Sequence, residues 1–416
     1  MSTAPCCGPA LMARLDELAS FSDDSERLTR HYLSPAHCRA MQTVKAWMEA
    51  AGMSARIDAV GNVIGRYEPR QPGAPAVLVG SHIDTVTDAG RYDGSLGVLA
   101  GIAAVEALHR AGERLPVAVE VIAFGDEEGV RFPSALIGSR ALAGTLDPSL
   151  LDARDRAGVS VREALRAAGC DADAAASCAR RAADTVGYLE VHIEQGPVLE
   201  AEGLPLGVVT AINGATRARV VVQGEAGHAG TVPMALRRDA LAAAAEMVLA
   251  VERAGRAVPD LVATVGQIEA LPGSINVVPG TVRFGLDVRA PVDAPRRTAL
   301  AALERTFGEI AARRRVEVAI DPFHETSAVS CDAGLIEALA AAVERAGVRP
   351  LRLPSGAGHD AIALAALCPV AMLFVRCQGG ISHNPAEAIT TADAGLAVQV
   401  LLDALRHVAA ARTPQS

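Results

Sequence analysis

Short apolar segments that end in polar residues and alternate with helical segments restrict the fold of this chain more than any other feature. The segment AVLVGSHID (residues 76–84) has the composition of a buried strand that runs into a polar turn, and VAVEVIAFGDEEG (residues 117–129) is a second such strand. Between them, SLGVLAGIAAVEALHRAG (residues 95–112) is typical of a helix that ends at a glycine. A strand, a helix and a strand in this order predict an α/β fold with a mostly parallel central sheet.

The stretch from residue 214 to residue 325 has a pattern of its own. In chain order it predicts a strand at 218–227, a helix at 239–255, strands at 261–270 and 281–291, a helix at 296–315 and a strand at 316–323. This order of elements is that of a ferredoxin-like α+β unit. We therefore predict two domains, one made of residues 1–212 and 328–416 and an inserted one made of residues 213–327.

Two other stretches are predicted to be helical. Residues 11–53 carry apolar stripes, which begin at Leu11, Leu15 and Leu18. The Ala/Arg-rich segment 151–183 favours a helical excursion from the first domain, and a low-complexity linker is the alternative.

The composition excludes several classes of function. Aromatic residues make up only 3% of the chain and the net charge is -9, which disfavours a nucleic-acid binder that needs a basic face and stacking rings. The eight cysteines form no CxxC pair, as expected of thiols in a reducing compartment. Neither a secretory signal nor an apolar run of membrane-spanning length is evident. We therefore expect a cytoplasmic protein that does not bind nucleic acid.

Histidine and acidic residues follow the first predicted strand. His82 can bind a metal through one ring nitrogen, and the Asp84 carboxylate is expected to accept the N–H of the other. Asp93 stands in a Gly-flanked turn before a helix, where its carboxylate can bridge two ions. A lone HxD pattern, however, is more often a surface turn.

Three more segments carry groups of the same kind. Glu127 and Glu128 follow the second strand, where adjacent acids are commonly a solvated turn. In a metal site one of them can bind the ion while the other takes a proton from water. His192 lies in EVHIEQGP and His383 in GGISHNPAE, and each alone fits an ordinary packed or surface histidine equally well. Together the three histidines and the carboxylates suit Zn²⁺ or Mn²⁺.

The order of these residues resembles the metallopeptidase-like M20 family of aminoacylases and carboxypeptidases. That resemblance covers nearly the whole chain and implies a di-metal catalytic domain with an inserted ferredoxin-like lid. It implies one ion held by His82, Asp93 and His192 and another held by Asp93, Glu128 and His383. It further implies that Glu127 is the general base and that Asp84 orients His82. The metals would be Zn²⁺ or Mn²⁺, with Co²⁺ or Ni²⁺ as alternatives.

Within this family, HIEQGPVLE (residues 192–200) resembles the amidase branch, which cleaves ureido and N-carbamoyl acids rather than peptides. The resemblance implies that His228 donates to the developing oxyanion, often from the neighbouring subunit. It also implies that Asn276 and Arg289 bind the substrate carboxylate, for which a guanidinium fork is suited. Gln195 is expected to contact the ureido group. A homodimer through the lid domain is implied as well.

The substrate is predicted from two segments. Ala215-Thr216-Arg217 and the FVRCQGGISH stretch (residues 374–383) resemble the allantoate type, in which Arg217 would bind a second polar arm. The resemblance therefore favours allantoate, hydrolysed to ureidoglycine, ammonia and CO₂. The alternatives are an N-carbamoyl-L-amino-acid hydrolase, a β-ureidopropionase, a ureidoglycolate amidohydrolase or an inactive metal-binding relative. His359, in SGAGHD, is expected to lie behind the site or to pack in the core.

Overall fold

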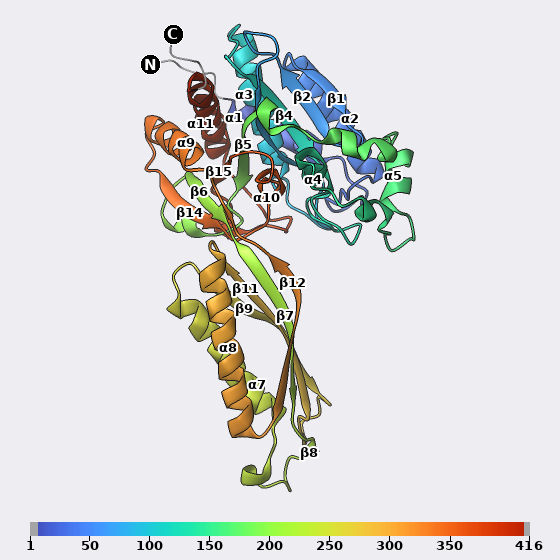
Figure 1. The fold of residues 1–416 in the computed structure, drawn as a ribbon, viewed down its shortest axis with the longest axis vertical. Coiled ribbons are helices and arrows are strands. Elements are labelled where there is room, and N and C mark those ends of the chain that lie inside the picture. The colour runs from blue at the N-terminus through green and yellow to red at the C-terminus, as the bar shows by residue number, and fades with distance from the viewer. Residues whose placement is uncertain (1–6, 412–416) are drawn as a thin grey trace. The chain divides into compact units, whose positions relative to one another are not determined.

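The computed structural model describes residues 7–411, and the chain divides into two compact units. Unit 1 comprises the described residues of 1–210, 331–353 and 358–416, and unit 2 comprises residues 211–330 and 354–357. Each unit has its own sheet (Figure 1). The first six residues, which belong to the N-terminal stretch predicted to carry no secretory signal, lie outside the described residues.

The larger sheet, which lies mainly in unit 1, is parallel at its centre and antiparallel at its edges. Its order is β1 (Ser54–Ile57), β2 (Val63–Tyr67), β4 (Ala118–Phe124), β3 (Ala76–His82), β5 (Thr185–Ile193), β15 (Val370–Val375), β6 (Leu206–Ile212) and β13 (Val329–Ser330), and β14 (Leu351–Ser355) also pairs with β6. Strands β4, β3, β5 and β15 run parallel to one another. This confirms the predicted mostly parallel sheet and brings the carboxyl ends of four strands to one edge.

Helix α3 (Ser95–Arg110) lies directly on the parallel strands. Twelve of its sixteen residues are buried. A Cβ on Gly97 would lie 2.2 Å from the backbone oxygen of Val191, so only glycine permits this close approach of α3 to β5. Because Asp93 precedes α3 and His192 follows Val191, the contact sets the separation of these two residues. Helices α1 (Gly8–Ala19), α9 (Ala333–Arg345) and α11 (Thr391–Ala410) complete this layer, with α1 and α9 both packed on α11.

The N-terminal region is less helical than its pattern predicts. Helix α1 ends at Ala19 and α2 (Pro35–Ala50) begins after fifteen intervening residues, so the prediction of helix over 11–53 is wrong for residues 20–34. The restart has a local cause, because Ser34 caps the helix by accepting the N–H of His37 and Pro35 occupies the first turn. The intervening segment instead supports the site described below.

The Ala/Arg-rich segment forms packed structure rather than a linker. It contains α5 (Val161–Ala167), which begins with a capping box between Ser160 and Glu163, and 3₁₀ turns at 148–152, 172–178 and 182–184. With α4 (Ile137–Ala143) and Phe132 it shares a small core, to which Leu151, Val161, Leu165 and Ala172 contribute. The helical excursion is therefore confirmed.

Unit 2 has the predicted ferredoxin-like order. Its antiparallel sheet runs β12 (Glu317–Thr326), β7 (Gly214–Gln223), β11 (Thr281–Ala290) and β9 (Val262–Leu271). Helices α7 (Ala240–Ala257) and α8 (Asp293–Arg314) pack on this sheet around a core that includes Phe284 and Phe307 (Figure 1). A short ribbon pairs β8 (Gly227–His228) with β10 (Val277–Val278). Among the described residues, no helix is both long and apolar enough to cross a membrane.

Candidate metal centre

Five of the predicted ligands converge at the carboxyl edge of the parallel strands in unit 1. His82 ends β3, Glu128 follows β4, and His192 lies near the end of β5. His383 lies in the loop between β15 and α11, and Asp93 in the turn before α3. Ligands in parallel sheets gather at this edge because the loops that follow the strands meet there.

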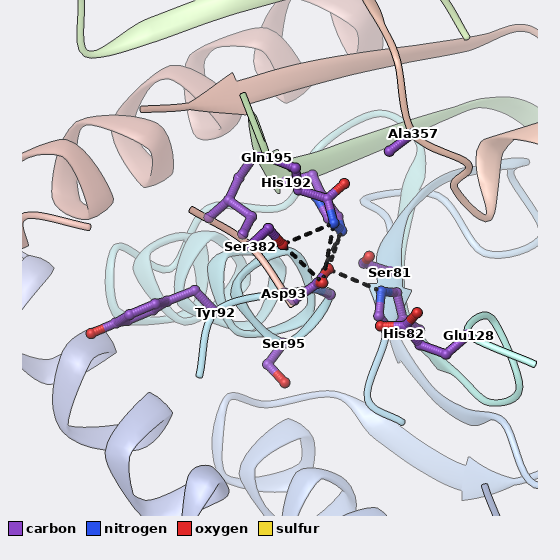
Figure 2. A network of polar contacts seen from close by, with 12 residues as sticks. Ser81, His82, Tyr92, Asp93, Ser95, Glu128, His192, Gln195, Ala357 and Ser382 are labelled. Atoms are coloured by element: carbon purple, nitrogen blue, oxygen red, sulfur yellow. Dashed lines mark hydrogen bonds and ion pairs between the residues drawn. The ribbon is translucent and has the colours of Figure 1, made fainter. Parts of the chain in front are cut away.

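Asp93 lies at the centre of the cluster and faces a different histidine group with each oxygen. Its Oδ1 lies 3.2 Å from His192 Nε2 and 3.6 Å from His82 Nε2. Its Oδ2 lies 3.1 Å from His383 Nε2, and Glu128 Oε1 lies 3.6 Å from that same nitrogen. Figure 2 shows the Asp93 carboxylate between His82 and His192. The structure thus contains two adjoining ligand groups that share one carboxylate.

The two buried histidines are oriented as metal ligands. His82 Nδ1 lies 2.9 Å from the backbone oxygen of Asp84, and His192 Nδ1 lies 2.9 Å from that of Ile193. A carbonyl oxygen accepts only, so each Nδ1 carries a proton, and Nε2 is the nitrogen that can bind a cation or, without one, a second proton. The backbone N–H of Gly94 donates to His192 Nε2, at 3.2 Å, which agrees with that tautomer. Both Nε2 atoms face Asp93 Oδ1, so these nitrogen and oxygen donors fit a divalent cation.

The charges of the cluster also fit cations. Burial acts to raise the pKa of Asp93, but hydrogen bonds with His192, His383 and His82 outweigh it and hold the pKa well below the ordinary value. The hydrogen bond to Asp93 raises the pKa of His383 to about 9, although partial burial opposes this. Asp93 therefore stays ionised and attracts positive charge, which protons supply in the metal-free protein.

Asp84 acts differently from the prediction. Its carboxylate lies 3.8 Å from His82 Nδ1, which is too far for a hydrogen bond, and the backbone oxygen of Asp84 orients the ring instead. Oδ1 accepts the N–H of Glu127 at 3.2 Å and Oδ2 that of Glu128 at 3.3 Å. The carboxylate thus joins the turn after β3 to the turn after β4.

The two acids after β4 are both shifted toward the protonated form. Burial raises the pKa of Glu127 well above its ordinary value, and the negative charge of Glu128 adds to this while His82 opposes it. Burial and the charge of Asp93 raise the pKa of Glu128 to about 7. A carboxylate with a raised pKa is a better proton acceptor, which is the property a general base needs.

Three residues around the cluster have left-handed backbone conformations without being glycine. These are Asp126 (φ 64), Gln195 (φ 57) and His383 (φ 54). Such conformations are uncommon for non-glycine residues and tend to gather at functional sites. Each lies in a turn at the carboxyl edge of the sheet.

The other predicted substrate ligands belong to unit 2. Arg289 donates to both oxygens of Asp287, at 2.8 and 2.9 Å, and to the backbone oxygen of Gly356 at 2.8 Å. Arg217 donates to Asp287 as well, at 3.0 Å, so one carboxylate holds both guanidinium groups. His228 pairs with Val277 between β8 and β10, next to Asn276, and its Nδ1 accepts the N–H of Gly230. Asp287 lies two residues before Arg289, and no sequence pattern indicates this role for it.

Comparison with known proteins gives the same picture. Residues 78–407 match peptidase family M20/M25/M40. The chain is 44% identical to a probable allantoate deiminase from Oryza sativa subsp. japonica, over 96% of this chain and 89% of that protein. It is 42% identical to an N-carbamoyl-L-amino acid amidohydrolase from Geobacillus stearothermophilus, over 95% and 97%. The crystal structure of an amidase of the hydantoinase/carbamoylase family from Burkholderia multivorans superposes with a TM-score of 0.93 at 35% identity, covering 97% of this chain and 98% of that one.

This chain belongs to peptidase family M20/M25/M40. The M20 family is metal-dependent, in agreement with the ligand groups found here.

The structure adds three residues to the M20 site that sequence reasoning did not assign. Glu387 is 4% exposed and accepts the backbone N–H groups of Tyr92 and Asp93, at 2.8 and 3.1 Å. Ser382 Oγ lies 3.1 Å from Glu387 Oε2 and 3.3 Å from Asp93 Oδ2. Both residues stand in GGISHNPAE, so their closeness to His383 was the available signal.

The third addition is Arg30, in the segment between α1 and α2. It is 1% exposed and donates to the backbone oxygen of Ile83 at 2.7 Å and to Ser95 Oγ at 3.2 Å. Burial lowers its pKa to about 10, against the charge of Asp84. Arg30 fixes the chain between His82 and Asp84, and no motif in the sequence indicates it.

His359 packs against the same ligands. Its ring centre lies 4.5 Å from that of His192, and the ring is 1% exposed. Burial and the neighbouring His192 hold its pKa well below the ordinary value. His359 therefore lies behind the metal centre as a neutral ring.

Proposed function

We propose that this chain is a metal-dependent amidohydrolase that cleaves the ureido C–N bond of a small ureido acid, with allantoate as the first candidate. The observation that carries the proposal is the pair of ligand groups that share Asp93, with the partly buried acid Glu127 beside them. The relatives named above, at 44% and 42% identity, support the substrate class.

Two divalent cations, Zn²⁺ or Mn²⁺ by the donor set, would be held by these groups. One would be held by His82, Asp93 and His192, and the other by Asp93, Glu128 and His383. When bound, such cations polarise a carbonyl oxygen and lower the pKa of water.

Glu127 is the proposed general base. One of its carboxylate oxygens lies within 4.8 Å of ligand atoms of His82 and Glu128, so it would lie beside the proposed cations. Its raised pKa favours taking a proton from the attacking water and passing it to the departing nitrogen. Asp84 holds the backbone of Glu127 and thereby fixes the base.

Gln195 is the proposed contact for the ureido group. Its Nε2 has two hydrogens, and they face Asp93 Oδ2 at 3.1 Å and Ser382 Oγ at 3.2 Å. Its Oε1 is buried and has no hydrogen-bond partner. An unpaired buried acceptor is costly, so it favours a substrate that brings an N–H donor. A ureido nitrogen supplies that donor, whereas an ester oxygen does not.

The residues of unit 2 are proposed to bind the rest of the substrate. Arg289 and Asn276 would bind the carboxylate, Arg217 a second polar arm, and His228 the developing oxyanion. Arg289 is held by Asp287 through Nε and Nη2 and still has N–H groups to offer. We include in the proposal a homodimer formed through unit 2, in which His228 acts on the neighbouring subunit's substrate.

An N-carbamoyl-L-amino acid is the second candidate substrate. The relative of that name is 42% identical and aligns over 97% of its own length. Such a substrate lacks the second ureido arm that Arg217 would bind, while the metal ligands and Glu127 would act unchanged.

The test is ammonia release by metal-stripped protein after Mn²⁺ is added back, with allantoate and N-carbamoyl-L-amino acids run in parallel. Preference for allantoate supports the proposal, and a substitution of Arg217 can then test whether it binds the second polar arm of that substrate. Preference for carbamoyl amino acids would keep the metals and the base and replace the substrate. Release from neither would overturn the ureido assignment. The E127Q variant is the control, since a protein that only binds metal would lose nothing measurable.

A further inference from the structure

Glu387 connects two loops of the metal centre through both of its carboxylate oxygens. Oε1 accepts the N–H groups of Tyr92 and Asp93, and Oε2 lies 3.1 Å from Ser382 Oγ. The site is built around this side chain, because a Cβ on Gly90 would lie 2.3 Å from Glu387 Cδ. Glu387 therefore fixes the turn that carries Asp93 against the loop that carries His383.

The hydrogens of Ser382 and Gln195 can be counted. Gln195 uses its two Nε2 hydrogens on Asp93 Oδ2 and Ser382 Oγ. Ser382 therefore accepts from Gln195 and has one hydrogen to give. Two acceptors lie in reach of that hydrogen, Glu387 Oε2 at 3.1 Å and Asp93 Oδ2 at 3.3 Å.

The choice between these acceptors matters for Asp93. A carboxylate oxygen has two lone pairs. On Asp93 Oδ2, one lone pair accepts a hydrogen from Gln195 Nε2. The other faces His383 Nε2, 3.1 Å away, in the ligand group with Glu128. A hydrogen from Ser382 would compete for this second lone pair.

We propose that Glu387 is a positioning residue for the shared carboxylate: it draws the Ser382 hydroxyl hydrogen to itself and so leaves Asp93 Oδ2 free to bind a cation with Glu128 and His383. The inference rests on the two-cation site proposed above. It concerns one of the two ligand groups more than the other, because Oδ1 serves His82 and His192.

The E387Q variant tests this direction. The carboxamide oxygen of Gln can still accept the N–H groups of Tyr92 and Asp93, but its NH₂ group would then face Ser382 Oγ. Ser382 would receive two donors and turn its own hydrogen to Asp93 Oδ2. We expect the second cation to bind about 10–100-fold more weakly while the first binds as before, the size usual for a lost outer contact of a metal ligand.

The S382A variant separates this mechanism from a purely structural role. It removes the hydrogen that E387Q would misdirect, so the S382A/E387Q double variant should recover the second-cation affinity of S382A alone. A role of Glu387 in holding the backbone only would not be rescued in this way. The matched control is D239N, because Asp239 Oδ1 also accepts two backbone N–H groups, from Leu241 and Ala242, at the start of α7 in unit 2.

The experiment is a titration of metal-free full-length protein with Co²⁺, followed by visible absorption, and with Mn²⁺ by equilibrium dialysis, at about pH 8, where an ordinary carboxyl is ionised. Wild-type and D239N proteins should bind two equivalents, with the second weakened in E387Q and restored in the double variant. Fewer than two bound cations per chain in the wild-type protein would overturn the proposed two-cation site itself. Two tight equivalents in E387Q, or no rescue by S382A, would overturn the role of Glu387 alone. If E387Q does not fold, S382A still decides, because a 10–100-fold loss in S382A would mean that Ser382 supports Asp93 directly.

Discussion

The carboxylate of Asp84 accepts the backbone N–H of Glu127 at 3.2 Å. The contact joins Asp84, which lies two residues after the proposed metal ligand His82, to Glu127, the proposed general base. The imidazole of His82 depends on the backbone oxygen of Asp84 and not on its side chain. The side chain of Asp84 therefore positions the general base Glu127, and its backbone oxygen orients the metal ligand His82.

Replacement of Asp84 by Asn should separate these two roles. Asn has a single acceptor oxygen, so one of the N–H groups of Glu127 and Glu128 would face an NH₂ group and lose its partner, at a cost of about 1–3 kcal/mol. We expect kcat to fall about 10–100-fold while the bound metal per chain stays at the wild-type value.

Metal analysis and steady-state kinetics on the same preparation check this. The D24N variant is the control, because Asp24 also accepts two backbone N–H groups, from Glu26 and Arg27, in an exposed turn. Loss of metal in D84N would show that the carboxylate orients His82 after all.

Replacement of Glu127 by Gln should abolish turnover without loss of metal. Gln cannot take a proton from water, and the usual contribution of a general base is about 10²–10⁴-fold in rate. We expect a loss of kcat in that range with little change in KM, measured as ammonia release. The comparison variant is E128Q, which should instead lose metal, because Glu128 is a proposed ligand with Asp93 and His383. Equal metal loss in both variants would contradict the division of roles.

The sequence was informative where a short motif fixes both the residue and its element. The apolar run that ends at His82 and the acids after Phe124 lie on neighbouring parallel strands, so their convergence follows from the strand order alone. The same reasoning predicted the ferredoxin-like unit, because six elements with clear periodicity admit few arrangements.

The sequence could not show contacts that depend on the path of the backbone. The spacing predicts that the Asp84 carboxylate orients His82. In the structure this carboxylate instead points to the turn after β4, where it accepts the N–H of Glu127. Arg30 is separated from Ile83 by more than fifty residues and stands in a segment with no motif. Glu387 lies in the GGISHNPAE motif, but the motif does not indicate its contacts, because its partners Tyr92 and Asp93 lie almost three hundred residues earlier.

Replacement of Arg289 by Lys should weaken substrate binding more than it slows the chemical step. Lys cannot reproduce the fork that donates to Asp287 through two nitrogens and offers the remaining N–H groups to a carboxylate. We expect KM to rise about 10–100-fold with a smaller change in kcat, in line with the loss of one charged hydrogen-bonded pair. The R219K variant is the control, because Arg219 lies on the same sheet as a 70% exposed side chain, 4.0 Å from its partner Asp321. A KM unchanged in R289K would remove Arg289 from the proposed carboxylate site.

Cation binding should release protons in a pH range set by His383. In the metal-free protein the hydrogen bond with Asp93 raises the pKa of His383 to about 9 from an ordinary value of 6.5, so the ring is protonated at neutral pH. A cation needs the neutral ring, so its affinity should increase as the pH rises toward about 9 and then level off. Because the folded-state pKa is raised, the protonated ring stabilises the metal-free fold fully below pH 6.5, and this stabilisation is lost as the pH rises through about 9.

Metal titration by calorimetry in two buffers of different ionisation enthalpy measures the released protons, and H383N should release fewer than wild type. H407N, a change in the last turn of α11, is the control. An affinity independent of pH between 6.5 and 9 would show that His383 is not a ligand of the second cation.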